Sequence, residues 1–244
     1  MRTIAVANRK GGEGKTILAF NLIAGASMRG RKVLAIDADG QANLTFLLGA
    51  DWQKPGTAEV LSGKIDIPQA VQRTKYADVL AGSIALATAT ANAKRLQYAL
   101  RNVKDYDICI IDCAPGLGLP MTNALTAAHE VIIPLQADTL SLQGLYMITE
   151  TIRQVQNGDN KTNPDLTVLG AVLSRYNGRS NVSRGMVQAI QSNCDALHIP
   201  YIDTPIREAA AVREAAVMRQ SVLEYAPASK PAQDFQNLLD ALNI

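Results

Sequence analysis

The stretch that decides the fold is residues 9–16, which read Arg-Lys-Gly-Gly-Glu-Gly-Lys-Thr. It follows a short apolar run at residues 4–7 and precedes an apolar, helix-periodic segment that begins at Ile17. Glycines at three of the eight positions allow successive backbone N–H groups to point inward. The helix that follows directs its positive end to the same place, which favours a bound phosphate. The pattern therefore predicts a strand, a phosphate-binding loop and a helix.

Two side chains of this loop have an expected chemical role. Lys15 is expected to place its ammonium group near the β- and γ-phosphates of a nucleotide, and the Thr16 hydroxyl to bind Mg²⁺. A purely structural turn is the alternative, which Gly-Lys-Thr at a strand-to-helix junction disfavours. The predicted nucleotide-binding residues of the loop are Gly11, Gly12, Glu13, Gly14, Lys15, Thr16 and Ile17.

Length and composition limit the class of protein. A chain of 244 residues is expected to form one α/β domain over residues 1–244. Its composition, 48% hydrophobic and 19% charged, is ordinary for a globular protein, and a net charge of +2 does not by itself indicate a nucleic-acid partner. Three cysteines suggest core thiols in a reducing cytosol rather than disulfides or a metal site. No apolar run approaches ~18 residues and no signal peptide is visible, so we expect a protein that is neither secreted nor membrane-spanning.

Short apolar runs alternate with helix-periodic segments along the whole chain. This alternation predicts an α/β fold with a mostly parallel, doubly wound sheet that carries helices on both faces. The expected strands cover residues 4–8, 33–37, 78–81, 107–112, 130–135, 167–174 and 200–203. The expected helices lie near residues 15–29, 42–48, 57–61, 93–103, 119–128, 141–157, 182–195 and 230–242.

Aspartates follow two of the expected strands, at the sheet edge where ligands of such folds bind. The run at residues 108–111 ends in Asp112, the arrangement of a Walker B carboxylate that holds Mg²⁺, commonly through water. The run at residues 33–36 is followed by Asp37 and Asp39. Asp37 is predicted to hold either the hydration shell of the metal or the loop itself. A turn residue or a helix cap is the alternative reading of either aspartate after the second strand.

The start of the phosphate loop departs from the common P-loop pattern, which needs a glycine where this chain has Arg9. Residues 10–16, Lys-Gly-Gly-x-Gly-Lys-Thr, resemble the deviant Walker A motif of the ParA/MinD (Soj-like) family of partition and positioning ATPases. The resemblance extends over essentially the whole chain, with further segments at residues 37–43, 116–120, 131–135, 141–145 and 224–227. It implies a P-loop NTPase fold, ATP and Mg²⁺ as cofactors, and ATP hydrolysis that is slow without a partner.

The resemblance also implies roles for single residues. Lys10 would reach across a nucleotide-sandwich homodimer to the partner's phosphates, although a solvated loop charge is the alternative. Asp39 would orient the attacking water, which a carboxylate does by accepting its hydrogen bond. Gly40 and Ala42 replace a proline and a glycine of the family's Asp-x-Asp-Pro-Gln-Gly-Asn segment, which bears on loop rigidity and dimer geometry. The residues expected beside adenine are Arg175, Pro205 and Arg207, of which the proline could equally be a turn residue.

Glu13 occupies a loop position where the family usually has a small or aliphatic residue. A carboxylate there would repel phosphates unless it points to solvent or pairs with a cation. Arg9 and a residue of the other subunit are examples of such a cation. A non-hydrolysing, nucleotide-gated scaffold remains an alternative because of this residue.

The resemblance predicts a ParA-type ATPase whose ATP-bound dimer binds DNA without sequence preference. It would position plasmid, chromosome or other cargo, be stimulated by a ParB-like partner, and be cytoplasmic and associated with the nucleoid. Arg179 and Arg184 crowd the start of an expected helix, where the helix dipole disfavours cations and a phosphate would relieve that cost. The candidate DNA contacts are Arg179, Arg184, Arg213 and Arg219, with a solvated surface as the equally weighted alternative.

Two rival functions remain open. MinD-like positioning on a membrane predicts a basic amphipathic C-terminal helix, whereas residues 230–244 carry one lysine and two aspartates, so that no membrane partner is expected. A P-loop metabolic enzyme, such as a dethiobiotin-synthetase-like ligase, would need a second substrate pocket, for which the sequence offers no motif.

Overall fold

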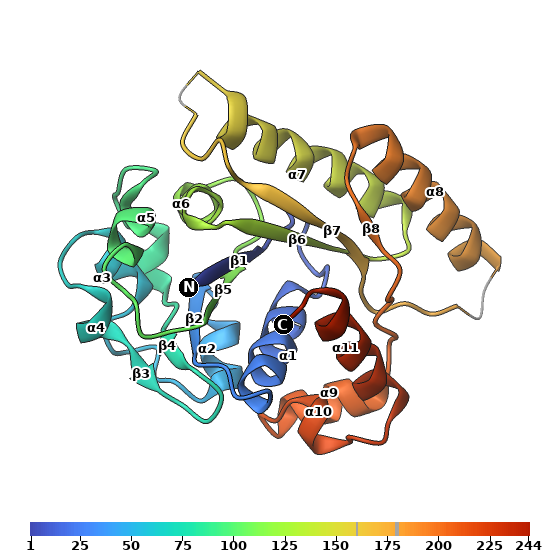
Figure 1. The fold of residues 1–244 in the computed structure, drawn as a ribbon, viewed down its shortest axis with the longest axis horizontal. Helices are drawn as coiled ribbons and strands as arrows, with labels where there is room; N and C mark the ends of the chain where they lie inside the picture. The colour runs from blue at the N-terminus through green and yellow to red at the C-terminus, as the bar shows by residue number, and fades with distance from the viewer. Residues whose placement is uncertain (160, 179–180) are drawn as a thin grey trace.

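The computed structural model describes residues 1–159, 161–178 and 181–244. An eight-stranded sheet forms its centre, in the order β3-β4-β2-β5-β1-β6-β7-β8 (Figure 1). Within the described residues, the edge pair β3–β4 is antiparallel and the other neighbouring strands are parallel, which confirms the predicted fold class. The strands are β1 (Arg2–Val6), β2 (Val33–Ala38), β3 (Gln72–Arg73), β4 (Asp78–Leu80), β5 (Ile108–Cys113), β6 (Glu130–Leu135), β7 (Thr167–Leu173) and β8 (Tyr201–Ile202).

Two separate hydrophobic cores flank the sheet. Because successive strand residues face opposite sides, Ile4 and Val6 of β1 enter one core and Ala5 enters the other. The first core is completed by α1 (Lys15–Met28), α2 (Asn43–Leu48), α9 (Ala210–Val217), α10 (Val222–Tyr225) and α11 (Lys230–Ala241). The second is completed by α3 (Thr57–Leu61), α4 (Ile67–Ala70), the 3₁₀ helix η1 (Ile84–Ala87), α5 (Arg95–Leu100), α6 (Leu119–Ala127), α7 (Thr139–Asn157) and α8 (Asn181–Leu197).

The register of the three central strands assembles one polar edge. β1 pairs with β5 up to Val6 opposite Asp112, and β2 pairs with β5 so that Asp37 lies opposite the same Asp112. The strands are parallel, so their carboxyl ends meet. The loop after β1 and the aspartates of β2 and β5 therefore lie side by side.

The structure adds several short elements that the sequence patterns did not predict, namely β3, α4, η1, α9 and α10. They span between two and eight residues, too few to show a hydrophobic period. The predicted short helix at residues 57–61 is present. α7 begins at Thr139, two residues earlier than expected, because Asp138 caps it by accepting a hydrogen bond from Ser141 N–H.

The C-terminal helix packs on α1 rather than standing free. Phe235, Leu238 and Leu239 of α11 are buried. At Gly25 of α1 an added Cβ would come within 2.3 Å of Leu239 Cδ1, so glycine allows this close approach. The apolar stripe of α11 is thus occupied by the body of the protein. In the described part of the chain, no helix has both the length and the apolar character needed to cross a membrane.

Candidate nucleotide-binding site

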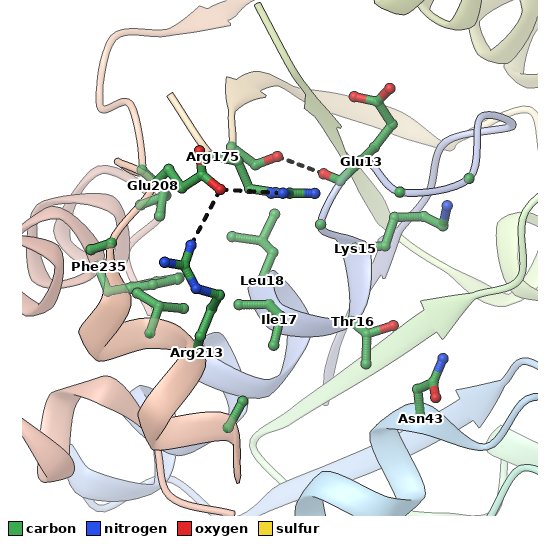
Figure 2. A pocket seen from close by; sticks show the side chains of 18 of the residues that line it. Glu13, Lys15, Thr16, Ile17, Leu18, Asn43, Arg175, Glu208, Arg213 and Phe235 are labelled. Carbon is green, nitrogen blue, oxygen red and sulfur yellow. Dashed lines mark hydrogen bonds and ion pairs between the residues drawn. The ribbon is translucent and has the colours of Figure 1, made fainter. Parts of the chain in front are cut away.

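A cavity of about 580 Å³ opens at the carboxyl edge of the sheet, a size typical of small-ligand sites (Figure 2). One wall is the loop after β1 with the start of α1, and the other comes from the segments after β7 and β8 and from α9 and α11. The predicted residues that line it are Gly11, Gly12, Glu13, Gly14, Lys15, Thr16, Ile17, Asp39, Arg175, Arg207 and Arg213. The cavity therefore gathers the phosphate-loop prediction in one place.

Backbone geometry fixes the curvature of the loop. Gly12 and Gly14 have φ angles of 82° and 79°, in the left-handed region that favours glycine. Ser174, directly after β7, donates a hydrogen bond of 2.6 Å from Oγ to the Glu13 carbonyl. A Cβ at Gly14 would lie 3.0 Å from that Oγ, so the contact also needs glycine. α1 then starts at Lys15 with its N-terminus at the cavity, the arrangement that binds phosphate.

The Lys15 ammonium group is held inside the loop. Its Nζ donates a hydrogen bond of 2.9 Å to the Lys10 carbonyl, and only 6% of the residue is exposed. Burial lowers the pKa of Lys15, and the charge of Asp112 works in the opposite direction. An anion in the cavity would supply the negative charge that this desolvated cation lacks.

Asp112 is one of the buried polar groups that lack a partner among the described residues. Neither carboxylate oxygen has a hydrogen bond among the described residues. Burial raises the pKa of Asp112 well above its usual range and Asp37 pushes it further, whereas the nearby Thr16 hydroxyl and Lys15 lower it. Thr16 thus lies close to the carboxylate without bonding geometry. A hydrated Mg²⁺ would satisfy these oxygens, and the residues present fit such an ion.

The two aspartates after β2 differ in their surroundings. Asp37 Oδ2 accepts hydrogen bonds from Thr45 N (2.8 Å) and Oγ1 (2.7 Å), and Oδ1 accepts one from Asp39 N (3.1 Å). Burial raises the pKa of Asp37 to about 6. These bonds fit the second of its two predicted roles, holding the loop. Asp39 lines the cavity while Oδ1 accepts Gln41 N at 3.0 Å. Ala42, where the family motif has glycine, is left-handed with φ 54°.

Lys10 lies outside the set of described residues that line the cavity. Its Nζ is 2.7 Å from Glu13 Oε1, 2.9 Å from both Asp138 oxygens and 3.1 Å from Ser141 Oγ. The Glu13 side chain is fully buried. Of the two expected arrangements, Glu13 thus pairs with a cation rather than pointing to solvent, and in this chain the cation is Lys10 instead of Arg9. Its carboxylate turns away from Lys15 and the cavity (Figure 2). It pairs with Lys10 instead.

The far end of the cavity carries charges that are already paired. Glu208 Oε1 lies 3.3 Å from both Arg175 Nη2 and Arg213 Nη1 (Figure 2). The Arg207 guanidinium is held by Asp234 of α11 through two bonds of 2.6 Å, so its charge is committed to that helix. This was not expected of a residue predicted to contact adenine. Pro205 lies outside the described lining residues. An apolar floor for a base is provided by Ile17, Leu18, Val212 and Phe235.

Comparison with known proteins accords with this geometry. A family model described as an AAA domain matches residues 1–168. The sporulation initiation inhibitor protein Soj of Bacillus subtilis is 33% identical over 97% of this chain and 96% of Soj. The chromosome partitioning protein ParA of Caulobacter vibrioides (strain NA1000 / CB15N) is 33% identical over 79% of this chain and 76% of that protein. The chain belongs to the ParA/MinD-type family of P-loop ATPases.

A solved structure extends the likeness to the whole fold. A Mycobacterium smegmatis protein described as cobyrinic acid a,c-diamide synthase was crystallised with ADP and magnesium. It is 35% identical with a TM-score of 0.84, covering 100% of this chain and 94% of that one. As a ParA-family member, the chain described here is an ATPase.

Sequence reasoning missed several lining residues of this ParA-family cavity. They are Leu18, Gln41, Asn43, Pro115, Ser174, Glu208, Ala209, Val212, Ala216 and Phe235. Glu208 directly follows the segment that was predicted to approach adenine, and this position in the sequence could have identified it as a lining residue. Phe235 reaches the cavity from a helix that gave no sign of a site.

Three of the four arginines predicted to contact DNA lie within the described residues, on separate elements. Arg179 lies outside the described residues. Arg184 donates a hydrogen bond of 3.0 Å to the Gly178 carbonyl. Arg213 lines the nucleotide cavity, and the Arg219 guanidinium lies 4.0 Å from the centre of the Phe46 ring. The structure thus brings Arg213 to the cavity and leaves Arg184 and Arg219 on other elements.

Proposed function

We propose that this ParA-family ATPase binds ATP with Mg²⁺, pairs as a nucleotide-sandwich homodimer and, as the dimer, binds DNA without sequence preference. A ParB-like activator then stimulates hydrolysis and releases the dimer, which moves plasmid, chromosome or other cargo within the cytoplasm. The observation that carries the proposal is the position of Lys10, which belongs to the phosphate loop yet lies outside its own subunit's cavity.

Each phosphate-end residue has a task in this scheme. Lys15 and the N-terminus of α1 hold the phosphates, and Thr16 and Asp112 hold Mg²⁺. The ion neutralises charge that develops on the phosphoryl oxygens. Asp39 lines the cavity and orients the attacking water. Because it only orients, nucleotide binding does not depend on it.

Two observations support a pairing face beside the loop. Leu117, in the segment after β5, is 55% exposed, and Leu140, in the first turn of α7, is 63% exposed. Both belong to segments that leave the carboxyl edge of the sheet, on the side where Lys10 meets Asp138. A second subunit would cover these side chains and bring its nucleotide towards Lys10.

Sedimentation velocity tests the pairing. The wild type is expected to be monomeric with ADP and dimeric with ATP and Mg²⁺, whereas Lys10→Ala should bind ATP and remain monomeric. Lys54→Ala, which changes an exposed lysine away from the cavity, should behave as the wild type. A normal ATP-dependent dimer in Lys10→Ala would remove the role assigned to that lysine.

Asp39→Ala tests the hydrolytic step. The variant is expected to bind ATP and dimerise, to lose hydrolysis, and to stay attached to DNA. Turnover at the wild-type rate, measured as phosphate release, would take Asp39 out of the mechanism and leave Asp37 as the next candidate.

DNA binding is tested by its dependence on salt. If arginines contact phosphate, log affinity should fall by roughly 0.9 per log unit of salt for each phosphate neutralised. Arg184→Ala and Arg219→Ala should each reduce this slope without altering ATP binding. Tight DNA binding by the nucleotide-free monomer would contradict the proposal.

The structure also bears on the rival functions. The apolar stripe of α11 is buried against α1, which disfavours MinD-like membrane attachment through that helix. A ligase would need a second substrate near the phosphates. The larger cavity of about 730 Å³ instead opens at the amino ends of β2 and β4, the opposite edge of the sheet from the phosphate loop.

A further inference from the structure

A small cluster of polar side chains joins the phosphate loop to the start of α7. It consists of Lys10, Glu13, Asp138 and Ser141, and we call it the Lys10 clasp. Lys10 Nζ has three N–H donors, and the clasp offers three acceptor groups, Glu13, Asp138 and Ser141 Oγ, between 2.7 and 3.1 Å away. An ammonium group held in this way has no donor left for a phosphate.

At the Lys10 clasp, α7 packs closely against the phosphate loop. At Gly144 of α7, an added Cβ would lie 3.2 Å from Asn8 Oδ1 and 3.4 Å from Lys10 Cβ. Asn8 is itself fixed, since its Nδ2 donates to the Pro134 carbonyl at 2.8 Å and its Oδ1 accepts Lys10 N at 3.0 Å. The backbone of Lys10 is therefore held in place, and its side chain decides where the ammonium goes.

The two carboxylates of the clasp are not equivalent. The Glu13 side chain has no exposed surface, whereas that of Asp138 is 44% exposed. If Lys10 left, water could solvate Asp138. Glu13 would remain a buried anion whose hydrogen-bond donors among the described residues are Gln136 N–H at 2.6 Å and the Ser141 hydroxyl at 3.0 Å. Release of Lys10 is therefore opposed chiefly by Glu13.

We propose that Glu13 is a positioning residue that holds Lys10 against α7 in the single subunit, so that Lys10 must exchange Glu13 for the partner's nucleotide phosphate when two subunits pair. The pairing step rests on the function proposed above. Glu13 thereby sets a threshold: it keeps nucleotide-bound subunits apart until their concentration is high enough to offset the lost ion pair.

Glu13→Gln isolates the charge from the shape of the loop. An amide oxygen at the position of Oε2 can still accept from Gln136 N–H and from the Ser141 hydroxyl, which lies 3.2 Å from that oxygen. The loop curvature depends on the Glu13 carbonyl, which stays bonded to Ser174. ADP binding by the variant checks that the loop is intact. Asp138→Asn gives a second variant at a half-exposed position where loss of folding is not a concern.

The first measurement is the rate at which the Lys10 amine is acylated in the nucleotide-free chain, read by peptide mass spectrometry. Glu13→Gln is expected to raise this rate at least about threefold, because the amine loses its strongest partner. Asp138→Asn should raise it less. Glu150→Gln, which removes an exposed carboxylate elsewhere on α7, should leave it unchanged. Unchanged Lys10 acylation in both Glu13→Gln and Asp138→Asn would overturn the clasp.

The second measurement is the protein concentration at which half the chains are dimeric with ATP and Mg²⁺. Glu13→Gln should lower this midpoint by roughly 3- to 10-fold, a size typical of releasing one close charge pair. A midpoint that is unchanged or higher, despite faster acylation, would overturn the threshold. A wild type that never dimerises would contradict the proposed function instead, and the acylation rates would still decide whether Glu13 holds Lys10.

Discussion

The two ends of the cavity differ in whether their charged groups already have partners. We call the end at the loop of residues 11–16 the phosphate end, and the end at Arg175, Glu208 and Phe235 the base end. At the phosphate end, the desolvated Lys15 ammonium bonds only a loop carbonyl among the described residues. Asp112, which is not among the described lining residues, is buried next to this end with no hydrogen-bond partner in the same set. At the base end, Glu208 already pairs with Arg175 and Arg213. Buried polar groups without partners are costly in a protein that binds nothing. The difference indicates that a bound ligand would supply the missing partners at the phosphate end. At the base end the charged groups are already paired, and the ligand would only pack against them.

Breaking the phosphate end should have the largest effect. Lys15→Ala removes the cation that burial has prepared for an anion, and we expect ATP affinity to fall by at least about 100-fold. Isothermal titration calorimetry measures the loss, and circular dichroism verifies the fold. Lys54→Ala is the matched control for a lost lysine. Unchanged affinity in Lys15→Ala would contradict the assignment of the loop.

Asp112→Asn sharpens the same comparison because it should raise the stability of the nucleotide-free chain and at the same time weaken the response to Mg²⁺. Removing a buried charge that faces Asp37 should raise the midpoint of thermal unfolding of the nucleotide-free chain by about 2–4 °C. The extra stabilisation that Mg²⁺ gives in the presence of ATP should disappear, and hydrolysis should fall by roughly 100-fold or more. Differential scanning calorimetry with and without Mg²⁺ separates the two effects. An Mg²⁺-dependent stabilisation equal to that of the wild type would show that Asp112 is not a metal-site residue.

The same contrast explains what could be predicted from the sequence. The phosphate end is lined by residues 11–17 of one continuous stretch and by Asp39, which follows an apolar strand, so local patterns contain it. The base end is assembled from Arg175, Glu208 and Phe235, which lie on three segments without a shared motif. Nothing in the residues around Arg207 indicates that Asp234 binds it.

Glu13 shows the same limit inside the predicted loop itself. Its neighbours in sequence identify a phosphate loop, but the direction of its carboxylate depends on Gln136, Asp138 and Ser141, more than 120 residues away. The fold class could be predicted because hydrophobic alternation persists over the whole chain. Two short elements were missed: α9, which lines the cavity and is alanine-rich, and α10, which is only four residues long.

At the base end, Arg207→Met should affect stability rather than ligand binding. It leaves the Asp234 carboxylate, which is 8% exposed, without its guanidinium partner. Because Arg207 itself is 43% exposed, we expect a modest loss of roughly 1–2 kcal/mol in the free energy of unfolding, with ATP affinity within about threefold of wild type. Urea unfolding and calorimetry measure the two quantities. The double variant Arg207→Met/Asp234→Leu should recover most of the loss. A fall in affinity with unchanged stability would mean that Arg207 contacts the nucleotide.

The smallest effect is expected at a paired carboxylate outside the cavity. Hydrogen bonds from Lys75 and Tyr76 hold the pKa of Glu224, on α10, below its ordinary value of 4.5. A lowered folded-state pKa means that the carboxylate stabilises the fold above pH 4.5, and that this contribution is lost as pH falls through the folded value.

Glu224→Gln should therefore lower the unfolding temperature by less than about 2 °C at neutral pH, since the pair is largely exposed. The difference from wild type should shrink below pH 4.5 and vanish in stronger acid, as scanning calorimetry across pH would measure. Lys75→Met should reproduce the effect, and the double variant should add little, because each change removes the same interaction. If the difference in unfolding temperature grew in acid, the sign of the predicted pH dependence would be wrong. A change in ATP affinity would show that this ion pair also affects nucleotide binding.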